Sequence, residues 1–94
     1  MANSSGVGAE AEKNGVRLQA TSTGTSVMLR YAIPNSAKVL LQAFNLLGQP
    51  VATLADGELE AGSYQASIGT LPPGAYWFRL AVGNDVVLSR VVVD

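Results

Sequence analysis

Residues 71–82 read Leu-Pro-Pro-Gly-Ala-Tyr-Trp-Phe-Arg-Leu-Ala-Val, and this stretch decides the fold class. Its first four residues are typical of a turn, because proline fixes φ and glycine accepts backbone conformations that are closed to other residues. Beyond the turn apolar side chains recur at every second position, and Arg79 marks the solvent side of a strand. Trp77 shares that side and points away from the core. The predicted core face consists of Tyr76, Phe78, Leu80 and Val82.

The same alternation recurs along most of the chain, between turns rich in glycine, proline, asparagine and aspartate. About seven short strands at this spacing are typical of a sandwich. The predicted strands cover residues 16–20, 26–33, 38–45, 51–55, 63–68, 75–82 and 86–93. The stripe expected to join two layers consists of Leu29, Tyr31, Leu41, Tyr76, Phe78 and Leu80. The sequence therefore predicts an all-β, Ig-like antiparallel β-sandwich.

Composition sets the expected limits of this domain. Residues 1–15 are rich in alanine, serine, glycine and glutamate without apolar periodicity, which is typical of a flexible linker or of a remnant outside the fold. We therefore expect the sandwich to span residues 16–94. A chain of 94 residues has room for one core of useful size, so a single domain is predicted.

The segment Asp56-Gly57-Glu58-Leu59-Glu60 places three carboxylates at alternate positions. Calcium binds carboxylate-rich loops, but this segment lacks the remaining oxygen ligands of an EF-hand loop. We interpret it as a short solvated acidic loop between two strands, with a calcium site as the less favoured alternative.

Several functional classes lack the residues they need. The chain contains no histidine and no cysteine, which removes the usual general base, the commonest zinc ligands and the thiol nucleophile. No residue set pairs a nucleophile with a tuned base, so we expect no enzymatic activity, no cofactor and no metal. The six lysines and arginines are scattered and the net charge is −1, which argues against a nucleic-acid partner. No apolar run is long enough to predict a membrane span.

A possible docking surface arises where large apolar side chains point away from the predicted core. In residues 38–45, Leu40 and Phe44 share the face opposite Val39 and Leu41, and Trp77 does the same in its own strand. An exposed aromatic platform can dock a neighbouring domain or stack sugars, and we favour docking. The alternative is a second apolar layer covered by loops.

Three segments together carry a family resemblance. They are Phe44-Asn45-Leu46-Leu47-Gly48-Gln49-Pro50-Val51-Ala52-Thr53-Leu54, then Ala61-Gly62-Ser63-Tyr64, and then Leu71-Pro72-Pro73-Gly74-Ala75-Tyr76-Trp77-Phe78-Arg79-Leu80. This succession resembles the C-terminal sorting domain of the bacterial type IX secretion system. It is also similar to the Ig-like domain of the flagellar hook-capping protein. The resemblance covers residues 26–94, and its motif turns lie around Gly48, Gly62, Gly74 and Tyr76.

The resemblance implies a non-catalytic C-terminal domain of a larger secreted bacterial protein. Such a domain follows a cargo domain through the periplasm and is recognised by the secretion machinery. A sortase-like surface protease then replaces it with an attachment at the outer-membrane surface. The chain lacks the Asn-Pro pair that often opens such domains, and Arg90 and Asp94 stand where several lysines are usual.

The last predicted strand is the expected recognition element, because a strand near the terminus can offer its backbone groups to a receptor. Its residues are Arg90, Val91, Val92, Val93 and Asp94. Two other functions stay open for the same fold. The domain could be an accessory module that binds carbohydrate through Trp77 and Phe44, or a spacer that packs against a neighbouring catalytic domain.

Overall fold

A computed structural model describes the backbone of residues 8–93, and this part of the chain consists of strands and turns without a helix. The period-two alternation of the sequence is realised as eight strands. In chain order they are β1 (Gly8–Lys13), β2 (Val16–Thr23), β3 (Ser26–Ile33), β4 (Ala37–Asn45), β5 (Pro50–Leu59), β6 (Gly62–Ile68), β7 (Gly74–Val82) and β8 (Asp85–Val93).

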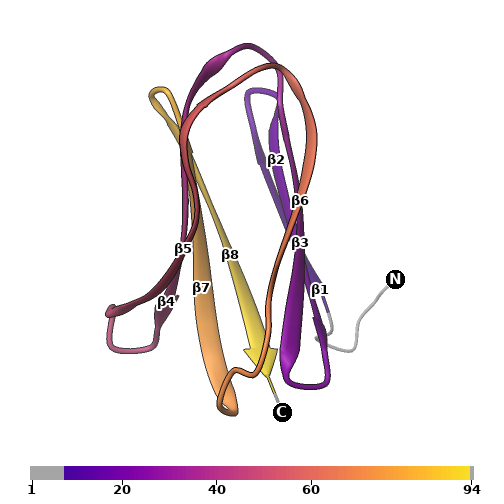
Figure 1. Cartoon of the computed structure of the whole chain (residues 1–94), viewed down its shortest axis with the longest axis vertical. Helices are drawn as coiled ribbons and strands as arrows, with labels where there is room; N and C mark the ends of the chain where they lie inside the picture. Colours follow the sequence, from indigo (N-terminus) through magenta and orange to yellow (C-terminus); the bar gives the residue numbers. More distant parts are fainter. Residues whose placement is uncertain (1–7, 94) are drawn as a thin grey trace.

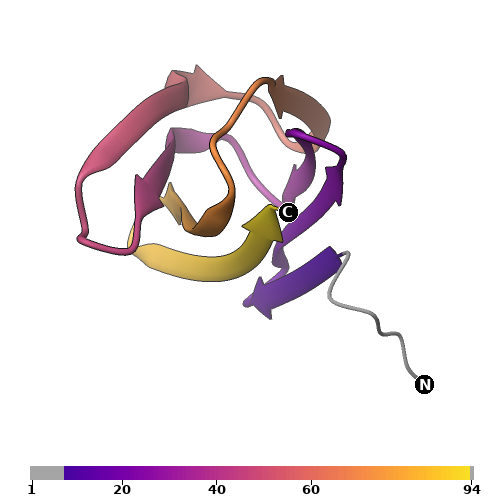
Figure 2. The same cartoon turned by 90° about the horizontal axis from the view of Figure 1, so that it is seen from below.

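The strands form two four-stranded sheets in the orders β1-β2-β3-β6 and β5-β4-β7-β8. Every pairing is antiparallel. The two sheets face each other as layers in Figure 1, and the view along the strands in Figure 2 shows how both curve around a common interior. The predicted Ig-like β-sandwich is therefore confirmed, with eight strands in place of about seven.

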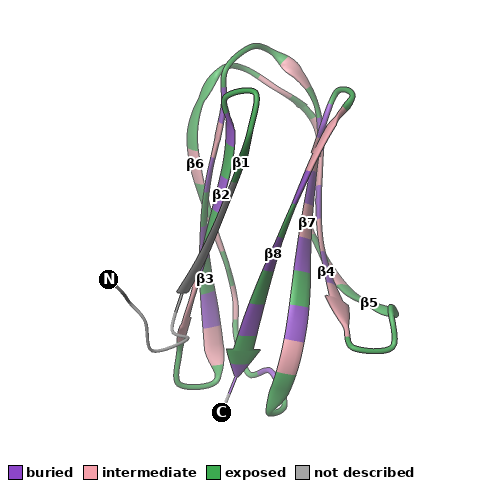
Figure 3. Ribbon diagram, turned by 180° about the vertical axis from the view of Figure 1, so that it is seen from behind, coloured by how far each residue is buried: buried purple, intermediate pink, exposed green. Residues whose placement is uncertain are grey.

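The core lies between the two sheets, where alternate side chains of both layers meet. The six residues of the predicted stripe are all buried, with none more than 6% exposed. Figure 3 shows the alternation of buried and exposed positions along β7 and β8. The largest fully buried side chains are Phe78, Leu18, Leu29, Leu41 and Leu80. Because side chains of one strand alternate between faces, this burial leaves the odd residues of β7 and the even residues of β8 on the outer face.

One expectation is corrected at the N-terminal end. Residues 8–13, expected to belong to a linker, form β1 and pair with β2 along their whole length. Asn14 and Gly15 connect the two strands with positive φ angles of 53° and 85°, which is the geometry of a tight hairpin turn. The asparagine-glycine pair is a strong hairpin signal. The strand before it was missed because the polar composition of β1 shows no apolar alternation. Residues 1–7 lie outside the described part of the chain.

A second correction concerns the acidic segment. Asp56 and Glu58 belong to β5, which continues to Leu59 instead of ending in a loop at Ala55. The register between β4 and β5 shifts between Leu41 and Gln42 and leaves Leu54 without a partner. Such a β-bulge breaks the alternation of side chains, and the alternation is the signal from which the strand was predicted.

Candidate functional site

The outer face of sheet β5-β4-β7-β8 carries the aromatic residues that the sequence singled out. Phe44 of β4 lies directly opposite Trp77 of β7, and Trp77 lies opposite Arg90 of β8. Trp77 is 37% exposed and Phe44 is half-buried. Residues directly opposite in neighbouring antiparallel strands have their Cβ atoms about 4.5–5.5 Å apart. The three side chains therefore form one continuous row across the sheet.

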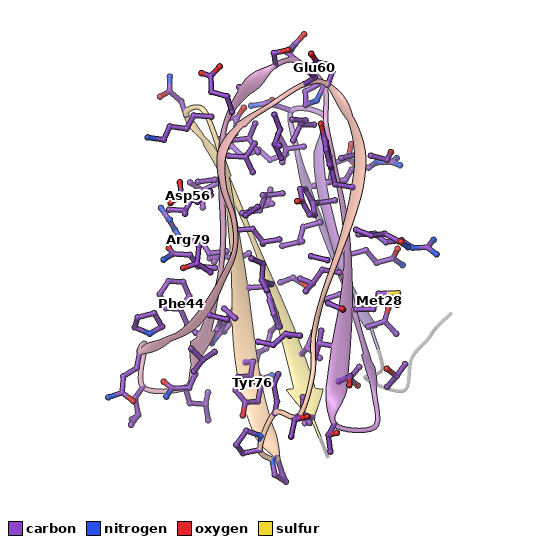
Figure 4. The ribbon with its side chains drawn as sticks, in the orientation of Figure 1. Met28, Phe44, Asp56, Glu60, Tyr76 and Arg79 are labelled. Carbon is purple, nitrogen blue, oxygen red and sulfur yellow. The ribbon has the colours of Figure 1, made fainter. Side chains whose placement is uncertain are left out.

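Leu40, the third residue of the predicted docking surface, lies on the same face but in another row. It pairs with Ala81, and between this row and the aromatic row lies the row of Gln42, Arg79 and Leu88. Figure 4 shows Phe44 and Arg79 projecting outward from this sheet, with Asp56 on the same side. The structure thus places Phe44 and Trp77 together and separates Leu40 from them by one row.

Sequence reasoning missed two apolar residues of this face. Leu88 is 52% exposed beside Arg79, and Val92 is 42% exposed beside Ala75. Both alternate with the buried residues of β8, so the same period-two reading that located the core could have found them. We call the surface made by Phe44, Trp77, Leu88 and Val92 the Trp77 face; Arg79 and Arg90 are interleaved with it.

The turn between β4 and β5 presents two more apolar side chains at the end of this sheet. Leu46 is 66% exposed and Leu47 is 83% exposed. Asn45 holds the turn, because its Oδ1 accepts hydrogen bonds from the backbone N–H groups of Leu47 at 2.9 Å and Gln49 at 3.0 Å. The side chain of Asn45 also donates to Gln49 Oε1 at 3.0 Å. The two leucines are therefore displayed on an ordered loop.

The predicted recognition strand is the outermost strand of its sheet in the hydrogen-bonding order. Arg90 and Val92 are exposed on the outer face, whereas Val91 and Val93 are 2% and 1% exposed. Beyond its pairing with β7, β8 lies against β1 and β2 of the other sheet. The strand is thus a structural part of the core on one face and accessible on the other. Asp94 lies outside the described residues.

The motif turns have the backbone conformations that glycine favours. Gly48, Gly62 and Gly74 have φ angles of 81°, 152° and 149°, and space is open where a Cβ would stand. Glycine is therefore favoured at these three positions because of the backbone conformation, and not because a side chain would clash with a neighbour. Tyr76 is 5% exposed, and its hydroxyl donates to the carbonyl oxygen of Pro72 at 2.6 Å. Figure 4 shows its side chain between the sheets near one end of the sandwich.

The acidic residues lie along and beyond β5 without converging. Asp56 is opposite Leu40 and Glu58 is opposite Lys38, and both carboxylates are exposed. Glu60 lies in the turn after β5, where its backbone carbonyl accepts a hydrogen bond from the Tyr64 hydroxyl at 2.6 Å. Figure 4 labels Asp56 on the side of the sheet and Glu60 at the end of the sandwich. Within the described residues no group of three acidic side chains could hold a metal ion.

The core holds a titratable group, the phenol of Tyr31, whose pKa is shifted. Burial raises the pKa of Tyr31, and the neighbouring Tyr64 adds to the effect. The two rings stack with their centroids 5.5 Å apart. Tyr31 is 6% exposed, so its environment is that of packed rings.

Comparisons of the chain with protein-family models, with curated protein sequences and with solved structures find no match. In the part of the chain that the structure describes, no helix meets the length and hydropathy of a membrane span.

Proposed function

We propose that this chain is a non-catalytic C-terminal sorting and surface-attachment domain of a larger secreted bacterial protein, of the type IX secretion class. The proposal rests on the resemblance carried by residues 44–54, 61–64 and 71–80. Its partners are an upstream cargo domain, the secretion machinery and a sortase-like surface protease, and it acts at the outer-membrane surface after passage through the periplasm.

The observation that supports the proposal best is that the turns of two of these segments, residues 44–54 and 71–80, meet the end of β8 at one end of a sheet. The third segment, residues 61–64, lies at the opposite end of the sandwich (Figures 1 and 4). Asn45 lies opposite Tyr76, and Tyr76 lies opposite Val91 of the proposed recognition strand. The turn that displays Leu46 and Leu47, the turn before β7 and the end of β8 all lie at the lower end of the view in Figure 1. Three chain segments could therefore be read by one receptor.

The Trp77 face extends this end of the sheet with exposed apolar surface. Aromatic side chains and arginine are enriched at protein interfaces, and both occur here in one row. One face of β8 packs in the core and the other is exposed. A receptor could therefore recognise its outer side chains, Arg90 and Val92, without unfolding the domain.

The test is export of a reporter. The full chain is fused behind a periplasmic reporter in a bacterium that has a type IX pathway, and reporter on intact cells is measured with an antibody. We expect the fusion to reach the surface. Retention in the periplasm, with the domain folded, would contradict the proposal.

Two substitutions make this test specific. Leu47→Ser changes a residue that is 83% exposed at the converging end, so it should reduce surface delivery without unfolding the domain. Met28→Ser is the matched control, because Met28 is 46% exposed on the outer face of the other sheet and should leave delivery unchanged. Equal delivery by both variants would remove the β4–β5 turn from the recognition surface.

The second candidate function is an accessory module that binds carbohydrate or packs against a neighbouring domain. The exposed Trp77 ring beside Phe44 favours it, because sugars stack on aromatic platforms. Affinity electrophoresis on neutral polysaccharides, with Trp77→Ala as comparison, tests sugar binding. Retardation that Trp77→Ala abolishes would support it, and unchanged mobility on every polysaccharide would exclude it for those polymers.

A further inference from the structure

An open hollow lies on the outer face of the other sheet, β1-β2-β3-β6, away from the Trp77 face. Its volume is about 530 Å³. Small-molecule sites commonly enclose roughly 300–1,000 Å³. Residues of three neighbouring strands line it, among them Arg17, Gln19, Arg30, Ala32, Ser63 and Gln65. Apart from Ser63, which belongs to the segment 61–64, none of these residues carries the proposed sorting function.

The strand register explains why this face is hollowed. One row across the sheet runs Arg17, Ala32, Ser63, and the next runs Gln19, Arg30, Gln65. Ala32 and Ser63 are short, whereas the neighbouring residues are long. The short side chains of Ala32 and of Ser63, on the edge strand β6, leave a low floor that is open toward the sheet edge. The long side chains of Arg17 and of the neighbouring row bound this floor on the other sides.

The two arginines are diagonal neighbours on adjacent strands. Arg17 lies opposite Ala32 of β3, and Arg30 lies two residues before Ala32 on the same face. Diagonal neighbours in an antiparallel pair are about 7–8 Å apart, within reach of long side chains. Two guanidinium groups can therefore approach one ligand from two sides of the floor.

Within the part of the chain that the structure describes, both guanidinium groups keep most of their hydrogen-bonding capacity for a ligand. Arg17 makes a long ion pair of 3.8 Å with Glu12, and the two side chains are 62% and 53% exposed. Arg30 forms no ion pair with any side chain that the structure describes. An exposed pair at this distance contributes little, so a better anionic partner can displace it.

We infer that this hollow binds an acidic saccharide, with a carboxylate held between Arg17 and Arg30. Guanidinium groups bind planar carboxylates in a bidentate manner. The amides of Gln19 and Gln65 and the hydroxyl of Ser63 can donate and accept, as sugar hydroxyls require. The hollow is open to solvent across three strands, so a polymer can extend beyond it. The inference does not depend on the sorting function and concerns a separate face.

The test titrates the full chain with trigalacturonic acid as the probe. Binding is measured from the chemical shifts of the backbone amides in NMR spectra. Saturable shifts of residues in β2, β3 and β6 are expected. Arg30→Gln and Arg17→Gln should each weaken binding about tenfold or more, as loss of one charge-assisted contact predicts. Glu12→Gln should tighten binding about twofold, because it frees Arg17. No saturable shift with the unmodified chain would overturn the inference.

The control variant is Lys38→Gln, which removes the same charge from an exposed position on the other sheet. Its affinity should equal that of the unmodified chain, and an equal loss in all cation variants would mean general charge attraction and contradict a built site. The neutral methyl ester of the probe should not bind. Inorganic phosphate is the last probe. If it binds as tightly as the trisaccharide, the hollow is an oxyanion site without sugar recognition, and the proposed acidic saccharide ligand is wrong.

Discussion

The hydroxyl of Tyr76 donates a hydrogen bond to the backbone carbonyl oxygen of Pro72, four residues earlier, at 2.6 Å. This bond ties the rigid turn of residues 71–74 to the start of β7. A tyrosine in this position, bonded back to the preceding corner, is a known feature of Ig-like sandwiches. Tyr64 makes the same four-residue connection to the carbonyl of Glu60 at the start of β6, in a more exposed setting.

Removing the Tyr76 hydroxyl should therefore destabilise the fold. Tyr76→Phe leaves a partly buried carbonyl without its partner, so we expect a loss of about 1–2 kcal/mol in the free energy of unfolding. Urea denaturation measures it. Tyr64→Phe is the matched control and should cost less than about 0.5 kcal/mol, because water can reach the Glu60 carbonyl. Equal losses in the two variants would show that burial does not distinguish these bonds.

The turn of residues 45–49 should depend on one side chain. Asn45→Ala removes the acceptor for two backbone N–H groups, and we expect a loss of about 1 kcal/mol with faster amide exchange at Leu47 and Gln49. Hydrogen exchange followed by NMR reports both amides. Gln49→Ala deletes only a side-chain contact with Asn45 and should leave exchange nearly unchanged. Slow exchange in Asn45→Ala would mean that the backbone bonds hold the turn alone.

Adjacent valines of β8 should respond very differently to truncation. Val91 is 2% exposed between the sheets, whereas Val92 is 42% exposed on the Trp77 face. Val91→Ala removes buried methyl groups and leaves a cavity, which should cost about 2 kcal/mol. Val92→Ala should cost less than about 1 kcal/mol, since it loses only strand preference and surface contact. Thermal and urea unfolding of both variants test this, and similar losses would contradict the assigned face of β8.

Stability should fall at alkaline pH through Tyr31. Its pKa is raised in the folded state above the usual tyrosine value of about 10, because burial disfavours the phenolate and Tyr64 adds to this. The folded state thus holds the proton more tightly than the unfolded state. The contribution of Tyr31 is fully present below pH 10 and is lost as the pH rises above it.

Urea midpoints measured from pH 8 to pH 11 test this prediction. The midpoint of the unmodified chain should decline above pH 10, and Tyr31→Phe should reduce the decline because it removes the ionising group. Tyr76 and Tyr64 remain in both proteins, so the comparison isolates Tyr31. A decline of equal steepness in Tyr31→Phe would assign the alkaline loss to other groups.

The alternation of side chains within single strands was predictable from the sequence. Val27 and Leu29 of β3 and Phe78 and Leu80 of β7 are buried as their spacing predicts. Alternation is a local property, because neighbouring residues of an extended chain point to opposite faces whichever strand lies beside them. Where the extended chain is interrupted, as at the bulge beside Leu54, the prediction failed and β5 was ended too early.

The missed hairpin of β1 has a different cause. Asn14-Gly15 is a turn signal, but the strand before it consists of small and charged residues and lacks the apolar alternation from which strands are predicted. The strand exists because β2 offers an edge for backbone pairing. Hydrogen bonds along the backbone do not depend on side-chain type, so they leave little trace in composition.

By itself, the sequence determined the fold class, the core faces of most strands, the glycine turns and the absence of histidine and cysteine chemistry. Only the tertiary structure decided the order of strands within each sheet. That order sets Phe44 beside Trp77 and Arg90 on one outer face, and Arg17 diagonal to Arg30 on the other. Phe44 and Trp77 belong to strands that are far apart along the chain, and such pairing depends on how all side chains pack together, which local periodicity does not encode. The other two pairs lie in hairpins of consecutive strands, where the register fixed by the turn decides which side chains become neighbours.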